Sequence, residues 1–226
     1  IDSAGSVNTT AGFSICTYTG TGSVGTIKHG LNTKPDAIIC KSRSGVEEWR
    51  PYFSVLGATK GMRLNGNNAE DTDAAYWNNT EPTSSVFTVG TNGGTNGSSV
   101  TTVAYCFHSV KGYSKFSSFV GNGNVDGSTI WCGFSPALVI IKSTATGVWR
   151  LWDNKRDALN PNTANFQPNA SNAEYDDPSV AIDFLSSGFK VRSTDSSYNG
   201  SGVSYIFMAF ASNPFTTSTG VPACAR

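Results

Sequence analysis

Charged residues are scarce in this sequence of 226 residues. Asp, Glu, Lys and Arg make up 14% of the chain, whereas they make up about a quarter of an average soluble domain. The 16 acidic and 16 basic side chains give a formal net charge of zero. A chain without excess positive charge has no general electrostatic attraction for nucleic acids or anionic membranes. We therefore expect no nucleic-acid binding.

Long apolar runs are also missing, because none approaches the roughly 20 residues that span a bilayer, and we expect no membrane insertion. The first residues, "IDSAGSVNTT", lack the basic and apolar regions of a signal peptide, and we interpret residues 1–11 as an N-terminal linker. The five cysteines follow no metal-site spacing. Cys40 and Cys106 stand in apolar runs, where a thiol acts as a small hydrophobic group. We expect mostly free thiols and folding in a cytoplasm.

Motifs for acyl or phosphoryl transfer are absent as well, including the nucleophile elbow, the zinc-protease helix and the phosphate-binding loop. The two histidines, His29 and His108, stand in no such motif. We therefore predict a protein that is not an enzyme and that has no cofactor.

An internal duplication fills most of the chain. "GFSICTYTG" at residues 12–20 is followed by "GYSKFSSFVG" at 112–121, and "KPDAIICKSRSGVEEWR" is followed by "SPALVIIKSTATGVWR". The matches keep their order with a period of about 100 residues, which fits a small β-domain or half of a larger sandwich. We assign residues 12–111 to repeat 1, 112–213 to repeat 2 and 214–226 to a C-terminal tail. No linker separates the repeats, so we expect them to pack closely.

Short apolar runs within each repeat are rich in β-branched and aromatic residues, and clusters of Gly, Pro and Asn separate them. This pattern is typical of antiparallel sandwiches and barrels. Only "NKRDALNP" could form one helical turn before Pro161 ends it. We predict an all-β protein, a tandem-duplicated antiparallel β-sandwich that is jelly-roll-like.

The strings that carry the duplication also carry a resemblance. "PDAIICKSRSG", "YWNNTEPTSSVFTVGTN", "GFSPALVIIK" and above all "VKGYSKFSSFVGNG" resemble a domain that recurs in virion proteins of tailed bacteriophages, such as tail fibres, over about residues 12–215. The resemblance implies a non-enzymatic virion component, assembled in the host cytoplasm among other virion proteins. It supplies no binding residues.

The function that we expect is adhesion: a tail-fibre or receptor-binding domain that recognises a glycan on the host surface. Because fibres commonly assemble as trimers, a homotrimer is the default expectation. A capsid decoration or head-fibre module is the structural alternative. The enzymatic alternative is a glycan-degrading enzyme, which needs two carboxylates about 5–10 Å apart.

Tryptophan next to amides is the candidate sugar site, because an indole face can receive the C–H face of a pyranose while amides bind its hydroxyls. Trp49 and Trp149 recur in both repeats as "WR" and are interpreted as core or interface residues. Trp77, Trp131 and Trp152 lack such counterparts. The candidates selected for binding are Trp77, Asn78, Asn79, Trp152, Asp153 and Asn154. The competing interpretation is that each tryptophan is simply buried.

Two weaker hypotheses concern carboxylates and amides. Asn122, Asn124 and Asp126 in "NGNVDG" place oxygens at alternate positions, as calcium loops do, but Gly133 stands where a bidentate Glu should be, and hairpin-turn chemistry explains the loop better. A second calcium site, or a glycosidase pair, could use the acidic clusters, for which solvated loops or turn caps are the simpler interpretation. Their members are Glu70, Asp71, Asp73, Glu174, Asp176 and Asp177.

Overall fold

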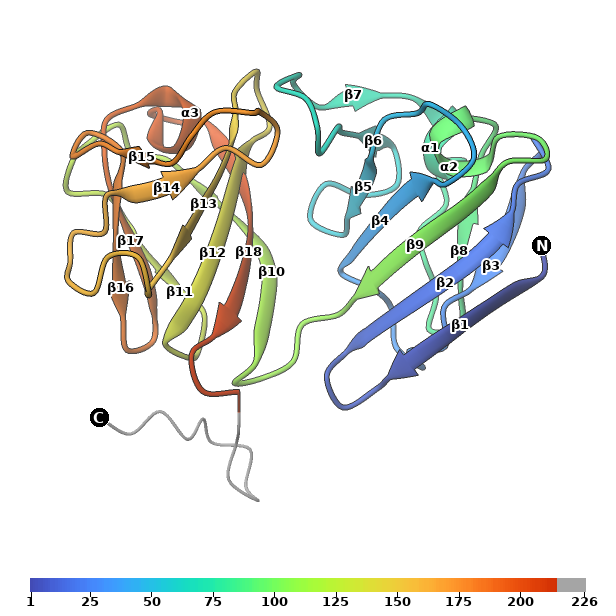
Figure 1. Ribbon diagram of the computed structural model, residues 1–226, viewed down its shortest axis with the longest axis horizontal. Helices are drawn as coiled ribbons and strands as arrows, with labels where there is room; N and C mark the ends of the chain where they lie inside the picture. The colour runs from blue at the N-terminus through green and yellow to red at the C-terminus, as the bar shows by residue number, and fades with distance from the viewer. Residues whose placement is uncertain (215–226) are drawn as a thin grey trace. The chain divides into compact units, whose positions relative to one another are not determined.

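The computed structural model describes residues 1–214, which form two compact units (Figure 1). Unit 1 comprises Ile1–Asn65 and Glu70–Ser109, and unit 2 comprises Gly66–Ala69 and the chain from Val110 onward. All strand pairs in the described residues are antiparallel, which confirms the predicted all-β class. The predicted tail, apart from Pro214, lies outside the described residues.

The larger sheet of unit 1 has the strand order β1-β2-β9-β4-β5. Its strands are β1 (Ser3–Asn8), β2 (Phe13–Thr19), β9 (Thr101–Phe107), β4 (Ala37–Ser42) and β5 (Arg50–Phe53). Every second residue of β2 is buried, as the two-residue period of a strand requires. Strand β1 corrects the prediction of an N-terminal linker, because it pairs with β2 over its full length.

A smaller sheet faces this one in unit 1, and the core lies between them. Its strands are β3 (Gly25–Lys28) and β8 (Val86–Val89). The remaining elements are β6 (Lys60–Gly61), β7 (Asp71–Thr72), α1 (Ala74–Trp77) and α2 (Gly93–Asn96). Ile27 and Phe87 from the smaller sheet pack in one cluster with Ile38 and Cys106 from the larger sheet, all of them fully buried.

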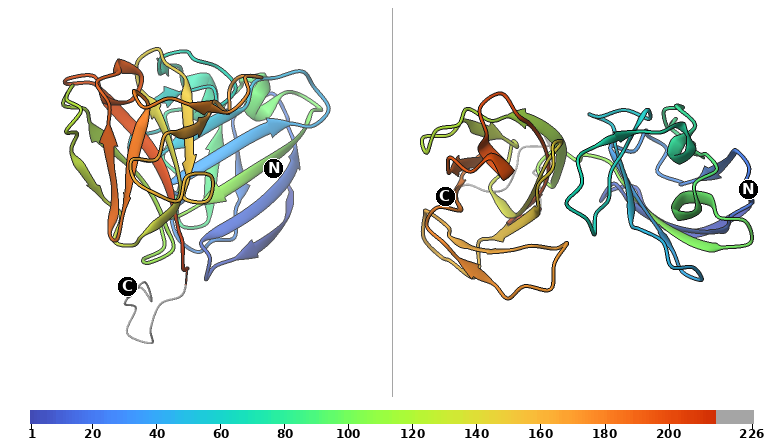
Figure 2. Two further views of the ribbon diagram at one scale, coloured as in Figure 1. Left: turned by 60° about the vertical axis from the view of Figure 1, so that its left-hand side comes forward. Right: turned by 90° about the horizontal axis from the view of Figure 1, so that it is seen from above.

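Unit 2 has a larger sheet of order β10-β18-β12-β13-β14-β15 and a smaller one of order β11-β17-β16. The larger sheet contains β10 (Ser114–Val120), β18 (Ser204–Ala211), β12 (Pro136–Ser143), β13 (Trp149–Asp153), β14 (Ala164–Phe166) and β15 (Tyr175–Asp176). The smaller contains β11 (Thr129–Trp131), β17 (Gly188–Arg192) and β16 (Ala181–Leu185), and α3 is Ser196–Asn199. Seen from above, the strands of unit 2 surround its core (Figure 2, right).

The two units share the arrangement of their larger sheets. The order β2-β9-β4-β5 in unit 1 corresponds to β10-β18-β12-β13 in unit 2. Single hydrogen bonds also correspond: the backbone N–H of Trp49 donates to Asn65 Oδ1 at 3.0 Å, and that of Trp149 donates to Asn169 Oδ1 at 3.0 Å. Helix α2 follows β8 and is capped by Asn92. Helix α3 follows β17 and is capped by Asp195. Both strands are the last of their smaller sheets in chain order.

Helical structure in the described chain is limited to three helices of four residues each. The predicted helical turn in "NKRDALNP" does not form, and that segment consists of turns and bends. A four-residue helix makes about one turn, so no apolar period could reveal it in the sequence. None of the helices in residues 1–214 has the length and apolar character to cross a membrane.

Candidate binding face of unit 2

Trp77 does not offer a sugar platform, because its side chain belongs to the core of unit 1. It is 2% exposed and meets the Tyr52 ring edge-on, with ring centroids 5.7 Å apart. Asn78 and Asn79 follow with positive φ values of 51° and 48°, a left-handed backbone that asparagine tolerates better than most residues. The Asn78 N–H donates to Ala74 O at 2.8 Å. These asparagines terminate α1, and the predicted glycan site around Trp77 is wrong.

Trp152 is buried as well, at 0% exposure, in the core of unit 2. Its indole N–H donates to Val180 O at 3.4 Å, and its ring meets Tyr198 edge-on at 5.7 Å. Asp153 Oδ1 accepts from the N–H of Lys155 at 2.9 Å, and hydrogen bonds from Arg156 lower the pKa of the carboxyl although burial opposes them. Asn154 Nδ2 donates to Ser212 Oγ at 3.0 Å. These contacts anchor a turn, so this second predicted glycan site is also wrong.

The predicted calcium loop is closed by its own hydrogen bonds. Asn122 Oδ1 accepts from the Asn124 N–H at 3.0 Å, and Asn124 Oδ1 accepts from the Asp126 N–H at 2.9 Å. Asp126 forms an ion pair with Lys190 at 2.6 Å. Within residues 1–214, no group of three or more His, Cys, Asp or Glu side chains is placed to hold a metal ion. The oxygens therefore stabilise a turn, as hairpin chemistry predicts.

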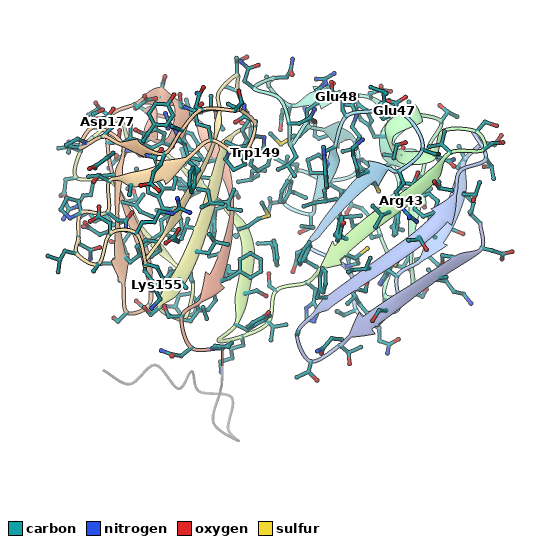
Figure 3. The ribbon with its side chains drawn as sticks, viewed as in Figure 1. Arg43, Glu47, Glu48, Trp149, Lys155 and Asp177 are labelled. Carbon is teal, nitrogen blue, oxygen red and sulfur yellow. The ribbon has the colours of Figure 1, made fainter. Side chains whose placement is uncertain are left out.

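The acidic clusters are likewise occupied locally. Each of the six carboxylates has a partner nearby: Glu70 with Lys60, Asp71 with Tyr76, Asp73 with the Ala75 N–H, Glu174 with Arg156, Asp176 with Thr163 and Asp177 with Ser179. Asp177 lies at the end of unit 2 near α3, and Lys155 lies toward the other end (Figure 3). The clusters are caps, turn anchors and ion pairs, as the simpler interpretation holds.

Trp131 is the most exposed tryptophan of the described residues, with 66% of its surface exposed. It lies on β11, where Thr129 is exposed, Ile130 is buried and Trp131 is exposed, in the alternation of a half-buried strand. Lys115 Nζ stands 5.4 Å from the ring centroid, within the range of a cation–π contact. Gly133, with φ +84°, supports the ring, because a Cβ there would lie 3.1 Å from the indole. Trp131 was not among the residues predicted to bind a glycan, because it stands between Ile130 and Cys132 rather than beside amides.

The matching strand of unit 1 carries a lysine where unit 2 carries this tryptophan. Ile27 and Ile130 are both buried, and Gly30 and Gly133 both have positive φ, +73° and +84°. These fixed points align "TIKHGL" with "TIWCGF" and place Trp131 on Lys28. The fold therefore does not require a tryptophan at this position. An exposed aromatic residue without a packing role is a stronger indicator of binding than a buried one.

Charged side chains continue the same surface along β17 and β16. Phe189 and Val191 point into the core, so Lys190 and Arg192 point outward. Arg192 Nη1 lies 3.2 Å from Asp126 Oδ1, and its Nε lies 2.5 Å from Asp183 Oδ2. We call this surface the outer face of unit 2 and define it by Lys115, Asp126, Thr129, Trp131, Asp183, Lys190 and Arg192.

A hollow of about 350 Å³ adjoins the outer face at Arg192. From Gly188, which pairs with Trp131, to Arg192 the strand covers roughly 13 Å at about 3.3 Å per residue. That length suits a short oligosaccharide rather than a single sugar. The hollow is lined by Val125, Asn160, Pro161, Pro178, Ala181, Asp183 and Arg192.

Unit 1 has a hollow of about 380 Å³, which Arg43 lines together with Asp2, Ser3 and Ala4. Arg43 is labelled in Figure 3. Tyr18, the aromatic residue in that lining, is 4% exposed, and its hydroxyl donates to Thr95 O at 2.5 Å. The Tyr18 ring is thus committed to the core. The outer face of unit 2 is the stronger candidate because its aromatic ring is open to solvent.

The fold defines an all-β protein of two antiparallel, sandwich-like units, and Trp131 is exposed on the outer face of unit 2. The chain belongs to the family described as a domain of unknown function, DUF7483, whose profile matches residues 1–214. Comparison with curated proteins finds no match, and comparison with solved structures finds none either.

Proposed function

We propose that this chain is a structural protein of a bacteriophage virion, the adhesion domain of a tail fibre or similar appendage, and that it binds a glycan on the host surface. The observation that carries the adhesive role is the exposed indole of Trp131 on the outer face of unit 2. The virion setting rests on the resemblance of strings such as "VKGYSKFSSFVGNG" to phage virion proteins.

Trp131 suits carbohydrate because an indole offers a broad apolar face beside polar groups. A pyranose buries its C–H face against such a ring, while its hydroxyls need nearby donors and acceptors. Lys115 lies over the ring and Lys190 stands diagonally across the β11–β17 pair from Trp131. Both ammonium groups can donate hydrogen bonds to sugar oxygens.

The tandem duplication is part of the proposal. The shared strand order and the paired hydrogen bonds of Trp49 and Trp149 support it. After duplication, one unit could keep the fold while the other acquired a binding surface. Assembly into a homotrimer with other virion proteins would present three such surfaces, and simultaneous contacts raise the avidity of weak individual sites.

Adhesion fits the outer face better than glycan cleavage does. A glycosidase needs one protonated carboxyl and one ionised carboxylate on either side of the scissile bond. Asp126 and Asp183 both contact Arg192, and the hydrogen bond from Lys190 lowers the pKa of Asp126. Asp126 therefore lacks the raised pKa that keeps a catalytic acid protonated at neutral pH.

A glycan array and a host-cell binding assay test the proposal with the wild type and Trp131→Lys, which places the residue of unit 1 at the matched position. We expect the wild type to bind and the variant to lose at least about tenfold in affinity, as loss of a central tryptophan usually causes. Lys28→Ser, an exposed change in unit 1, serves as control. Equal binding by wild type and Trp131→Lys would refute the site.

Antibody labelling of phage particles tests the virion setting separately. Label at the tips of tail appendages supports the fibre assignment. Label on the capsid, with a copy number that matches the capsid lattice, would replace it with the decoration module.

A further inference from the structure

We propose that the site at Trp131 and Lys115 selects sugars that carry a carboxylate, of the uronic acid class. This inference rests on the proposed glycan-binding function and specifies the ligand of the same site. Three observations carry it. Lys115 has a charge without an ion-pair partner in residues 1–214, the neighbouring charges form ion pairs with one another, and unit 1 has different residues at the matched positions.

Lys115 stands on β10, at the edge of the larger sheet, and Trp131 stands on β11, at the edge of the smaller sheet. The cation–π contact of 5.4 Å joins these two edges. Within residues 1–214, none of the ion pairs involves Lys115. Its ammonium group is therefore available to an anionic ligand, and its flexible stem can follow that ligand across the ring.

The other charges of the outer face are already balanced. Asp126 bridges Lys190 at 2.6 Å and Arg192 at 3.2 Å, and Asp183 contacts Arg192 at 2.5 Å. The outer face thus has three cations, Lys115, Lys190 and Arg192, and two carboxylates. Lys115 is the cation without a carboxylate partner. The local surplus of positive charge lies next to the exposed indole, although the whole chain has no net charge.

Both partners of this contact differ from unit 1. The register places Ser14 opposite Cys106 on β9 and Lys115 opposite Ala209 on β18, at matched points of the two larger sheets. Ser14 is buried, whereas Lys115 reaches the surface. Since Lys28 matches Trp131, unit 1 has neither the indole nor the cation in this arrangement. Two contacting residues that the fold does not require indicate a function of unit 2.

A uronic acid satisfies both groups at once. Its pyranose ring stacks its C–H face on the indole, and its carboxylate, one bond away from that ring, pairs with the ammonium of Lys115. A neutral sugar makes only the first contact. The upper part of the range for an exposed ion pair, about 0.4–1 kcal/mol, corresponds to a roughly two- to fivefold gain in affinity, and we expect a gain of this size from the carboxylate.

The experiment compares uronate oligosaccharides with their methyl esters, which keep the ring and remove the charge. The panel consists of oligogalacturonate, oligomannuronate and hyaluronan fragments, and tryptophan fluorescence measures binding to the full chain. We expect at least one acid to bind two- to fivefold more tightly than its ester. We also expect this advantage to fade as salt rises from 0.05 to 0.5 M, because salt screens exposed charges.

Lys115→Ser, which introduces the residue of unit 1, should abolish the preference for acid and keep the affinity for the ester. Lys28→Ser makes the same charge change in unit 1 and should alter neither. Thermal unfolding of both variants confirms that they fold. Equal affinity for acid and ester, an undiminished preference in Lys115→Ser, or no binding to any acid on the panel would overturn the inference.

The outcomes also separate this inference from the proposed function. Neutral glycans bound through Trp131, with no preference for acid, refute the carboxylate and leave the adhesive function standing. A sulfated neutral oligosaccharide that binds as tightly as the best uronate shows that any anion suffices and overturns the uronic acid assignment. Loss of all glycan binding on the array refutes both.

Discussion

Asn96 in unit 1 and Asn199 in unit 2 perform the same task with the same atoms. Asn96 Nδ2 donates to Gly90 O and Ser23 O, both at 2.7 Å, and Asn199 Nδ2 donates to Ser193 O at 2.7 Å and to Asn124 O at 2.8 Å. Asn96 Oδ1 accepts a hydrogen bond from the Thr21 N–H, in the loop after β2. Asn199 Oδ1 accepts one from the Asn122 N–H, in the loop after β10. Both side chains are buried, so each amide fastens a loop to the end of a short helix.

Substitution of these asparagines should destabilise each unit to a similar extent. Asn96→Ala leaves the buried Gly90 carbonyl, the Ser23 carbonyl and the Thr21 N–H without their partner, and we expect a loss of about 2–3 kcal/mol in the free energy of unfolding. Asn199→Ala should cost about the same. Urea unfolding followed by fluorescence and by circular dichroism measures both, with a separate fit for each transition if the units unfold in two steps.

The exposed Asn172 provides the control, because its change to Ala should shift the free energy of unfolding by no more than about 0.5 kcal/mol. Losses below that value for Asn96→Ala and Asn199→Ala would contradict a structural role for the shared amide.

Strands were the most predictable part of this fold. "FSICTYT", "TTVAYCF" and "AIDFL" coincide with β2, β9 and β16. In β2 and β9 every second residue is buried, so the sequence shows the two-residue period of a half-buried strand. Strand β1 escaped prediction because its residues are small, polar and mostly exposed. Its stability comes from backbone pairing with β2, which leaves no apolar pattern in the chain.

The candidate binding residues were harder to predict than the strands. Trp77 and Trp152 stand beside amide and carboxylate residues in the sequence and are buried, whereas Trp131 stands between Ile130 and Cys132 and is exposed. Trp77 and Trp152 face the cores through the partners Tyr52 and Tyr198, which are distant in sequence. Only the alternation across Thr129, Ile130 and Trp131 carried a local signal of an outward indole. Exposure depends on which face of a strand is covered, and single residues do not encode that.

The three tryptophans should differ sharply when truncated. Trp77→Ala and Trp152→Ala each empty a large buried volume, and we expect losses of about 3–5 kcal/mol in the free energy of unfolding. Trp131→Ala removes an exposed side chain and should cost less than about 1 kcal/mol. Thermal and urea unfolding of the three variants provide the comparison. A loss for Trp131→Ala as large as that for Trp152→Ala would mean that the indole packs a core after all.

Among the cysteines of the described residues, Cys40 and Cys132 should resist modification until the chain unfolds. Cys16, Cys40, Cys106 and Cys132 are buried and free, and burial raises the pKa of Cys40 and of Cys132 to about 12. Because the thiolate is the reactive form, both should react slowly at pH 8.

Labelling with a disulfide reagent in a Cys224→Ser background tests this expectation. We expect little labelling of Cys40 and Cys132 in the native protein and reaction of all four buried thiols in guanidinium chloride. Rapid labelling of native Cys40 or Cys132, identified by mass spectrometry of peptides, would contradict the burial of these thiols.

His29 should make unit 1 sensitive to mild acid. The imidazole is 1% exposed, and burial lowers its pKa from the ordinary 6.5, although the hydrogen bond to Thr83 opposes this. Nδ1 accepts from the Leu31 N–H at 3.2 Å, and Nε2 faces Thr83 O at 3.2 Å, so the neutral ring carries its proton on Nε2. Protonation would put a second proton on the ring, at Nδ1. Nδ1 could then no longer accept from the Leu31 N–H, and two donors would face each other.

The sign of the pH effect follows from these contacts. Below pH 6.5 the unfolded chain binds a proton at His29 that the folded chain does not, so stability falls as the pH falls. The slope is at most about 1.4 kcal/mol per pH unit. Urea unfolding of unit 1 at pH 7.5, 6.0 and 5.0 should show this loss in the wild type, and His29→Gln should flatten it. His108 is present in both proteins, so its own titration cancels in the comparison. Parallel pH profiles for the two proteins would show that His29 is already charged in the folded state or titrates freely there.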